Sequence, residues 1–262
     1  MPEVTTPYAP GTPCWVDLAA PDQQAALDFY AGVLGWTGEI GPPEMGGYAV
    51  CRLGGKPVAG IMAAVAMGDQ PAPPTVWTTY LACADADAAR GSVESAGGTV
   101  LMPVTDVMSL GRMFIAADPT GAVFGVWQAV DFPGAGVANE PGALIWNELN
   151  TTDRSAASAF YRAALGIEST AMEGAEHYDA LQVNGRPVGG MQPMPEHLPA
   201  DTPSHWLTYF AVADADAAVD RVRAAGGNTI MEPFDMIAGR MAVVTDPQGA
   251  VFALIQPRPM GG

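Results

Sequence analysis

Apolar side chains alternate with large or acidic ones along the run Cys-Trp-Val-Asp-Leu at residues 14–18. Successive side chains of a strand point to opposite faces, so this alternation predicts a β-strand with one buried face. Trp15 and Asp17 share one face of the predicted strand, and the apolar residues around them share the other. The pattern returns at residues 145–149 as Ile-Trp-Asn-Glu-Leu, where a tryptophan and an acid again alternate with apolar positions.

This second strand opens a copy of the whole first half of the chain. Trp146 and Glu148 match Trp15 and Asp17, and later pairs keep the same order: Phe29-Tyr30 with Phe160-Tyr161, Pro57-Val58 with Pro187-Val188, and Asp118-Pro119 with Asp246-Pro247. The spacing between the copies shortens one residue at a time, in Gly-, Pro- or polar-rich stretches that are typical of loops. We predict two similar domains, 13–129 and 144–256, joined by a linker at 130–143 that is rich in Gly and Pro.

Within each half the hydrophobic period switches twice between strand and helix. In the first half we predict helices that begin after Asp22 and Asp85, both at N-cap positions, and end at Gly35 and near Gly97. The predicted strands lie around Trp36 and at 48–53, 58–64, 76–82, 99–102, 113–117 and 123–127. Each half therefore consists of two βαβββ units, which is an α+β fold. Residues 1–12 have no such period and are expected to form a loose arm.

Composition and charge narrow the function classes. Each half of the 262 residues is large enough for its own hydrophobic core. A formal net charge of −17 argues against nucleic acid and anionic membranes as partners. Because no apolar run reaches the roughly 20 residues of a membrane span and no secretory leader opens the sequence, we expect a soluble, cytoplasmic protein. The cysteines Cys14, Cys51 and Cys83 match aliphatic residues in the second copy, which favours small buried hydrophobes over reactive thiols.

Short motifs recur in both halves in one order. Asp22 stands eight residues before Tyr30, Gly97-Gly98 follows the second helix, and Asp118-Pro119-Thr120-Gly121 precedes the last strand; the second half repeats these motifs at Asp153, Tyr161, Gly226-Gly227 and Asp246-Pro247-Gln248-Gly249. This order resembles the glyoxalase and bleomycin-resistance group of the vicinal oxygen chelate superfamily over nearly the whole chain. The resemblance implies that paired βαβββ units curl their sheets into a cup, with helices outside and a ligand site inside.

The resemblance also implies a divalent metal inside the cup, held by His, Gln or Glu side chains. The matching positions of this chain carry other residues: Trp15, Thr78 and Gly125 in the first half, and Trp146, Leu207 and Ala253 in the second. The metal position has thus lost its ligands, and we expect neither a metal nor another cofactor.

The three histidines do not restore such a site. His177, His197 and His205 all lie in the second half and have no histidine counterpart in the first. His205 shares strand parity with the predicted inward residues of its strand, so it is expected to enter the second cup. A chance metal site from His205 and Glu148 stays open beside the simpler interpretation of a histidine that is exposed or singly hydrogen-bonded.

Aromatic side chains take over the position of the lost metal. Trp15 and Trp146 occupy it directly, and strand parity places further side chains beside them: Thr78, Tyr80 and Trp127 in the first half, and His205, Leu207 and Tyr209 in the second. Indole surfaces in a concave site suit planar ligands, so we predict that these residues bind ligand. The alternative is that they fill the cups as core. Trp77 and Trp206 have the opposite parity and are expected to pack behind the sheets.

Two carboxylates and two arginines are the main polar candidates for chemistry. Asp17 and Glu148 face the predicted ligand, and a carboxylate buried among aromatic rings has a raised pKa and can act as a general base. Each could instead anchor a ligand hydroxyl or amine, or make a structural hydrogen bond. Arg112 and Arg240 recur in both copies, and we favour ion pairs with the repeated Asp106 and Asp235 over contacts with a ligand carboxylate.

Two function classes follow. In the first, the protein binds a small hydrophobic aromatic compound without a metal, for antibiotic sequestration and self-resistance or as an accessory of antibiotic biosynthesis, where a biosynthetic enzyme is a candidate partner. In the second, it is a glyoxalase-like lyase or isomerase that uses Asp17 or Glu148 as general base. A structural module with filled cups is a third, simpler possibility. Monomer and homodimer both remain open.

Overall fold

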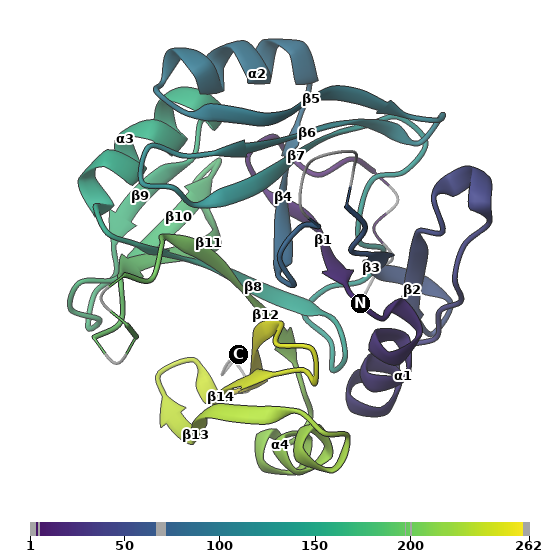
Figure 1. Cartoon of the computed structure of the whole chain (residues 1–262). Coiled ribbons are helices and arrows are strands. Elements are labelled where there is room, and N and C mark those ends of the chain that lie inside the picture. The colour runs from purple at the N-terminus through teal and green to yellow at the C-terminus, as the bar shows by residue number, and fades with distance from the viewer. Residues whose placement is uncertain (1–3, 5, 67–71, 197, 200, 259–262) are drawn as a thin grey trace.

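The structure is a computed structural model that describes residues 4, 6–66, 72–196, 198–199 and 201–258. It forms two tandem α+β domains, each built on one curved mixed sheet (Figure 1). The first contains β1 (Pro13–Ala20), α1 (Gln23–Leu34), a 3-10 turn (Pro43–Met45), β2 (Ala49–Leu53), β3 (Lys56–Ala63), β4 (Trp77–Cys83), α2 (Ala86–Ser95), β5 (Thr99–Val107), β6 (Gly111–Ala117) and β7 (Val123–Ala129). The second contains β8 (Leu144–Thr151), α3 (Arg154–Leu165), β9 (Glu168–Ala171), β10 (Asp179–Val183), β11 (Arg186–Pro193), β12 (His205–Ala211), α4 (Ala215–Ala224), β13 (Asn228–Met236), β14 (Gly239–Thr245) and β15 (Val251–Pro257).

Each sheet draws its strands from one half of the chain. The order is β2-β3-β1-β4-β7-β6-β5 in the first sheet and β13-β14-β15-β12-β8-β11-β10-β9 in the second. The second sheet has an extra strand, β9. We expected the matching strand of the first half around Trp36, but it does not form. There the chain makes only an isolated bridge from Thr37 to Arg52. The linker region 130–143, which the structure describes throughout, contains no helix or strand.

The helices begin and end where the local chemistry directs. The Asp22 and Asp153 side chains accept the Ala25 and Ala156 amides at the starts of α1 and α3, which satisfies donors that the first turn leaves free. Both helices end at a glycine with positive φ, a backbone conformation that a side chain disfavours. None of the described helices is long and apolar enough to cross a membrane.

The two largest hydrophobic cores do not follow the domain division, which corrects the expectation of one core per half. Two smaller clusters, around Trp15 and around Tyr209, each stay on one sheet. Of the two largest cores, one joins Tyr30 and Trp77 of the first half to Phe210 and Phe252 of the second; the other joins the α2 and α3 sides of the two sheets. The helices correspondingly pack in pairs across the halves, α1 with α4 and α2 with α3 (Figure 1). Each sheet therefore covers its helix-facing side partly with the other half of the chain.

Two tryptophans behind the sheets confirm the parity argument. Trp77 and Trp206 are buried in these shared cores and donate their indole N–H groups to the hydroxyls of Tyr30 and Tyr161, both at 3.0 Å. The parity of Cys14 was wrong: it lies with Trp15 rather than opposite to it, because the ladder between β1 and β4 is shifted between Pro13 and Trp15.

The region before β1 is pinned down rather than loose in the residues that the structure describes. The Gly11 amide donates to the Ala82 carbonyl, and the Tyr8 hydroxyl donates to the Ala135 carbonyl at 2.6 Å. Ala135 belongs to the linker region, and its amide in turn donates to the Cys14 carbonyl. The arm and the linker thus hold each other against the first sheet.

The repeated arginines make the predicted ion pairs. Arg112 contacts Asp106 at 2.9 Å and Asp87 at 2.7 Å, and Arg240 contacts Asp235 at 3.6 Å and Asp216 at 2.6 Å. These pairs are exposed, and such surface bridges contribute little to stability.

Candidate functional site

A buried hydrogen-bonded unit lies on the face of the first sheet that points away from the helices, which we call the first cup. The indole N–H of Trp15 donates to the hydroxyl of Tyr48 at 2.8 Å, and that hydroxyl donates to Asp17 Oδ2 at 3.3 Å. The Tyr80 hydroxyl also hydrogen-bonds Asp17. β1 supplies Trp15 and Asp17 at alternate positions, and the antiparallel ladder places Tyr80 opposite Trp15.

The second sheet repeats this unit on the matching face, the second cup. The indole N–H of Trp146 donates to the Tyr178 hydroxyl at 2.9 Å, and the Tyr209 hydroxyl donates to Glu148 Oε1 at 2.8 Å. Tyr178 hydrogen-bonds Glu148 as well. Both copies therefore hold a carboxylate between two tyrosines, one of which also accepts from a tryptophan.

Glycines on the neighbouring strands make room for the tyrosines. A Cβ atom at Gly60 would overlap the Tyr48 hydroxyl, and one at Gly190 would overlap the Tyr178 hydroxyl. Gly60 pairs with Asp17 and Gly190 with Glu148 in the parallel ladders, so each ring lies over a bare strand next to its carboxylate. Only glycine permits this close approach.

Burial sets the electrostatics of both units. Asp17 and Glu148 are 4% and 5% exposed. Burial raises the pKa of Asp17 to about 7, although its bonds from Tyr80 and Tyr48 favour the charged form. Burial likewise raises the pKa of Glu148 above its usual range, against the bonds from Tyr209 and Tyr178. The partners of both carboxylates are neutral, so neither charge is paired with a cation inside the unit.

The Gly190→Ala substitution is expected to lower the free energy of unfolding by about 1–3 kcal/mol, the usual cost of overpacking a filled site. The added methyl group must displace the Tyr178 ring and so break its bonds with Trp146 and Glu148. Urea denaturation measures the change. Gly32→Ala is the matched control, because a Cβ there meets nothing within 4 Å and the site is helical. Equal unfolding free energies for the two variants would show that the ring does not need the bare strand.

The first cup is covered by the chain itself. The Phe132 ring of the linker region packs edge-on against Trp15, with ring centroids 4.9 Å apart, and lies 6.1 Å from Trp127. The indole N–H of Trp127 donates to the Phe132 carbonyl at 2.9 Å, and the Phe132 amide donates to the Leu110 carbonyl. This cover leaves three side chains of the first cup buried: Trp15, Tyr80 and Trp127. Thr78, which lies farther along β4, is only partly buried.

The second cup is arranged differently at three places. Trp146 is partly exposed, unlike Trp15. Ile255 stands where the first copy has Trp127, and Phe234, which is 37% exposed, stands where it has Thr105. Phe234 pairs with Met241, which pairs with Ile255, so these three side chains form one row across the sheet.

A polar strip ends the second cup beyond Glu148. Gln192 donates through Nε2 to Glu148 Oε1 at 2.9 Å and to Asn150 Oδ1 at 3.0 Å. Asn150 Nδ2 lies 3.4 Å from His205 Nε2, and His205 Nδ1 lies 2.9 Å from the Pro203 carbonyl. A proton on Nδ1 satisfies both contacts of His205, because Nε2 then accepts from the amide. The first copy has Met62, Ala19 and Val76 in place of the strip.

The residues at the positions that the resemblance assigns to the metal do not fit a metal ion. A tryptophan, a threonine and a glycine occupy them in the first cup, and a tryptophan, a leucine and an alanine in the second, none of which offers carboxylate or imidazole. In the ranges that the structure describes, no three His, Cys, Asp or Glu side chains come close enough together to hold an ion. His205 and Glu148 do not form a pair, since Gln192 and Asn150 lie between them.

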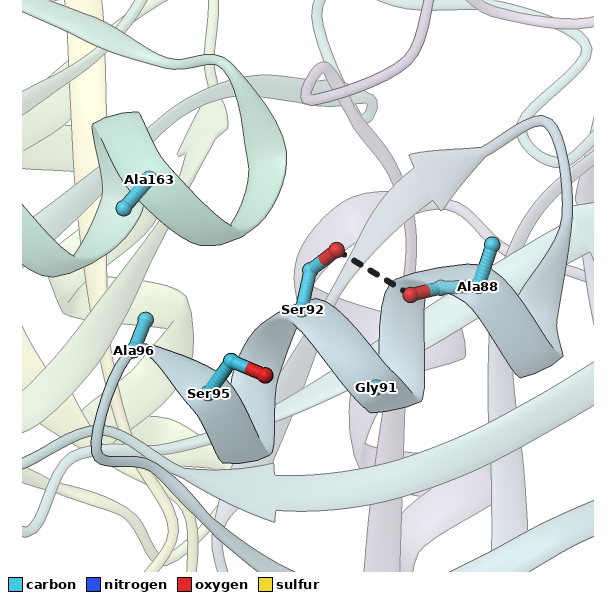
Figure 2. Close-up of a pocket in the computed structure, with 6 residues that line it drawn as sticks. All are labelled: Ala88, Gly91, Ser92, Ser95, Ala96 and Ala163. Atoms are coloured by element: carbon cyan, nitrogen blue, oxygen red, sulfur yellow. Dashed lines mark hydrogen bonds between the residues drawn. The ribbon is translucent and has the colours of Figure 1, made fainter.

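Two hollows of the molecule lie away from both cups. One, of about 420 Å³, opens between α2 and α3 and is lined by small side chains: Ala88, Gly91, Ser92, Ser95, Ala96 and Ala163 (Figure 2). Ser92 already donates its hydroxyl to the Ala88 carbonyl. The other, between Gly11, Leu81 and Trp206, has no room for a water molecule. Neither touches a buried carboxylate, so neither offers the chemistry of the cups.

The structure brings the sequence candidates together in two groups of unequal exposure. Trp15, Asp17, Thr78, Tyr80 and Trp127 share the first cup, and Trp146, Glu148, His205, Leu207 and Tyr209 share the second. His177 is exposed on a loop, and His197 lies outside the described residues.

Sequence reasoning missed Tyr48 and Tyr178, as well as Gln192 and Asn150. The tyrosines had a readable signal, because the duplication retains each of them together with a glycine on the following strand, Gly60 or Gly190. Gln192 and Asn150 had none, since neither recurs in the first copy.

Comparisons with known proteins agree with this architecture. The sequence pattern of the Glyoxalase/Bleomycin resistance protein/Dioxygenase superfamily matches residues 14–126 and 143–254. The putative glyoxylase CFP32 of Mycobacterium tuberculosis (strain CDC 1551 / Oshkosh) is 44% identical over 96% of this chain and 97% of its own length. The anthracycline biosynthesis protein DauV of Streptomyces sp. (strain C5) is 39% identical over 97% of this chain and 96% of its own.

Solved structures show the same fold at low identity. The Mn(II)-bound glyoxalase from Novosphingobium aromaticivorans superposes with a TM-score of 0.65 at 20% identity, covering 94% of this chain and 82% of that one. The 2,2',3-trihydroxybiphenyl 1,2-dioxygenase from Sphingomonas wittichii strain RW1 gives 0.65 at 16% identity, covering 97% and 93%. With both halves matched by the family pattern and two relatives similar over almost their full length, this chain belongs to the Glyoxalase/Bleomycin resistance protein/Dioxygenase superfamily.

Proposed function

We propose that this protein binds a small hydrophobic aromatic compound in its cup without a metal. The observation that carries the proposal is Trp146, a partly exposed indole beside the buried carboxylate Glu148. The resemblance assigns this tryptophan to the position of the family's metal. An indole face offers apolar area with a preferred geometry for a planar ring. A carboxylate with neutral partners attracts a hydrogen-bond donor or a cation on the same ligand.

The relatives support the class of ligand. A protein that is 39% identical over almost the whole chain is named for anthracycline biosynthesis. Anthracyclines contain a flat, fused aromatic ring system. A binder of this kind could sequester such a compound. It could equally serve as an accessory protein in the biosynthesis of the compound, together with a biosynthetic enzyme. The net charge of −17 is compatible with a cationic ligand.

A second candidate is a glyoxalase-like lyase or isomerase in which Asp17 or Glu148 acts as general base. The observation that favours it is the pKa of Asp17, which burial raises to about 7, close to the value that suits proton abstraction at neutral pH. A relative that is 44% identical is named a putative glyoxylase. We favour the binder because Phe132 covers the first cup and because, among the residues that the structure describes, neither cup provides a cation to stabilise negative charge on a substrate.

Titration of the protein with doxorubicin, an anthracycline that carries a primary amine, tests the proposal. We expect quenching of tryptophan fluorescence with saturation, and the same affinity and melting temperature after treatment with EDTA, because no ligand contact passes through a metal. Trp206→Phe is the control, since Trp206 is buried behind the sheet and its loss should leave the affinity unchanged. Near one zinc, nickel or manganese per domain by elemental analysis, with binding lost on chelation, would contradict the metal-free proposal.

A further inference from the structure

The duplication provides two copies of one binding face in different states. In the first cup Phe132 brings an aromatic ring edge-on to Trp15, at an interplanar angle of 87°. Its backbone is held on both sides, since its amide donates to Leu110 and its carbonyl accepts from Trp127. An aromatic group therefore already lies against the tryptophan that corresponds to Trp146.

The described residues around the second cup give Trp146 no equivalent neighbour. The aromatic group on Trp15 is part of a pair, Phe132 and Trp127, and the second copy has Ile255 at the place of Trp127. The row from Phe234 through Met241 to Ile255 instead adds apolar surface next to the row that contains Trp146 and Tyr209, and Phe234 is 37% exposed. This surface suits a flat ring system that is larger than one phenyl group.

The opposite end of the second cup is polar, whereas the corresponding end of the first cup is apolar. Glu148 is linked through Gln192 and Asn150 to the partly exposed His205, whereas the first copy has apolar residues at the three places beyond its carboxylate. The second cup therefore runs from an apolar row to a buried carboxylate and an amide strip. A ligand that matches it is aromatic at one end and carries a hydrogen-bond donor at the other.

We propose that Phe132 occupies the first cup in place of a ligand, so that each chain binds a single planar aromatic molecule, in the second cup, with its rings against Trp146 and its amino group toward Glu148. This inference rests on the proposed function and assigns it to one of the two copies. A tethered phenyl ring excludes a free ligand because its effective concentration is in the millimolar range, so only a much tighter ligand could displace it.

Calorimetric titration with doxorubicin and four forms of the full chain tests this assignment by stoichiometry. We expect one site per chain for the wild type, two for Phe132→Ala, none for Trp146→Ala, and one for the double variant, now in the first cup. Phe132 is only partly buried on an irregular segment, so its truncation should leave the fold intact, which circular dichroism checks.

The outcomes separate the inference from the proposed function. Three results would overturn the inference but not the proposed function: two sites in the wild type, a single site in Phe132→Ala, or binding by the single variant Trp146→Ala. Failure of doxorubicin to bind both the wild type and Phe132→Ala would overturn the proposed function and the inference with it.

The affinity of a Glu148 variant tests the contact at the polar end of the second cup separately. Glu148→Gln keeps the shape of the side chain but removes its charge, so affinity for doxorubicin should fall by about tenfold, as expected for a hydrogen bond to a charged group. N-acetylated doxorubicin lacks the cationic amine and should bind wild type and Glu148→Gln equally. Equal losses for the amine and its N-acetyl form would contradict the placement of the amine at Glu148.

Discussion

Asp17→Asn should make the protein more stable at pH 8, by about 2 kcal/mol in the free energy of unfolding. Burial raises the pKa of Asp17 from 3.8 to about 7, and a tenfold change in proton affinity corresponds to about 1.4 kcal/mol between the two protonation states. Above pH 7 the folded chain must hold this carboxylate charged without a cation. The amide removes that cost and still accepts from a tyrosine hydroxyl, although one of the two bonds becomes weaker, which reduces the gain.

The pH dependence of this gain has a defined sign. Between pH 3.8 and about 7 the folded chain retains a proton on Asp17 that the unfolded chain has released, so stability falls as the pH rises through this window. The difference between Asp17→Asn and wild type should therefore be small at pH 4, grow through the window and level off above pH 7. Urea denaturation at several pH values measures it.

The exposed Asp131→Asn removes the same charge without burial and is the control for net charge. A stability gain for Asp17→Asn that is independent of pH, or equal to that of Asp131→Asn, would show that Asp17 is not held charged at a cost. Both copies of the unit retain a buried carboxylate despite its cost, and sites of this kind commonly give up stability for function.

A hundredfold or greater loss of turnover in the double variant Asp17→Asn/Glu148→Gln is the expected result if either carboxylate is a general base, because an amide cannot take up the proton. Binding of the substrate would then change little. If the carboxylates only anchor a ligand, the same variant should lose affinity for cationic ligands and have no turnover to lose. We expect this second outcome.

The assay needs a substrate for each outcome. Turnover of a glutathione hemithioacetal tests the glyoxalase-like reaction, and doxorubicin titration of the same samples tests binding. A measured turnover that disappears in the double variant while the titration is unchanged would establish the enzyme and exclude the binder as the main function. The single variants then show which cup carries the reaction.

The sequence alone determined the duplication, the order of the helices and of all strands except the one expected around Trp36, and the faces of β1 from Trp15 onward. These features depend on neighbours within a few positions. The alternation of Trp15 and Asp17 with apolar residues follows from the strand period, and Asp22 and Gly35 bound α1 because a helix end needs a cap and a terminator. The residues that the resemblance assigns to the family's metal position, among them Trp15 and Trp146, stay a prediction from sequence spacing.

Only the tertiary structure decided how the two halves share their cores and which cup is covered. The pairing of α1 with α4 and the contact of Phe132 with Trp15 join residues that are far apart in the chain, and no local period encodes such contacts. The same reason hid Tyr48 from the candidate site, since its hydroxyl reaches Asp17 only when β3 presents Gly60 beside β1. Strand register and the path of the linker therefore determine which aromatic residues lie buried and which remain partly exposed.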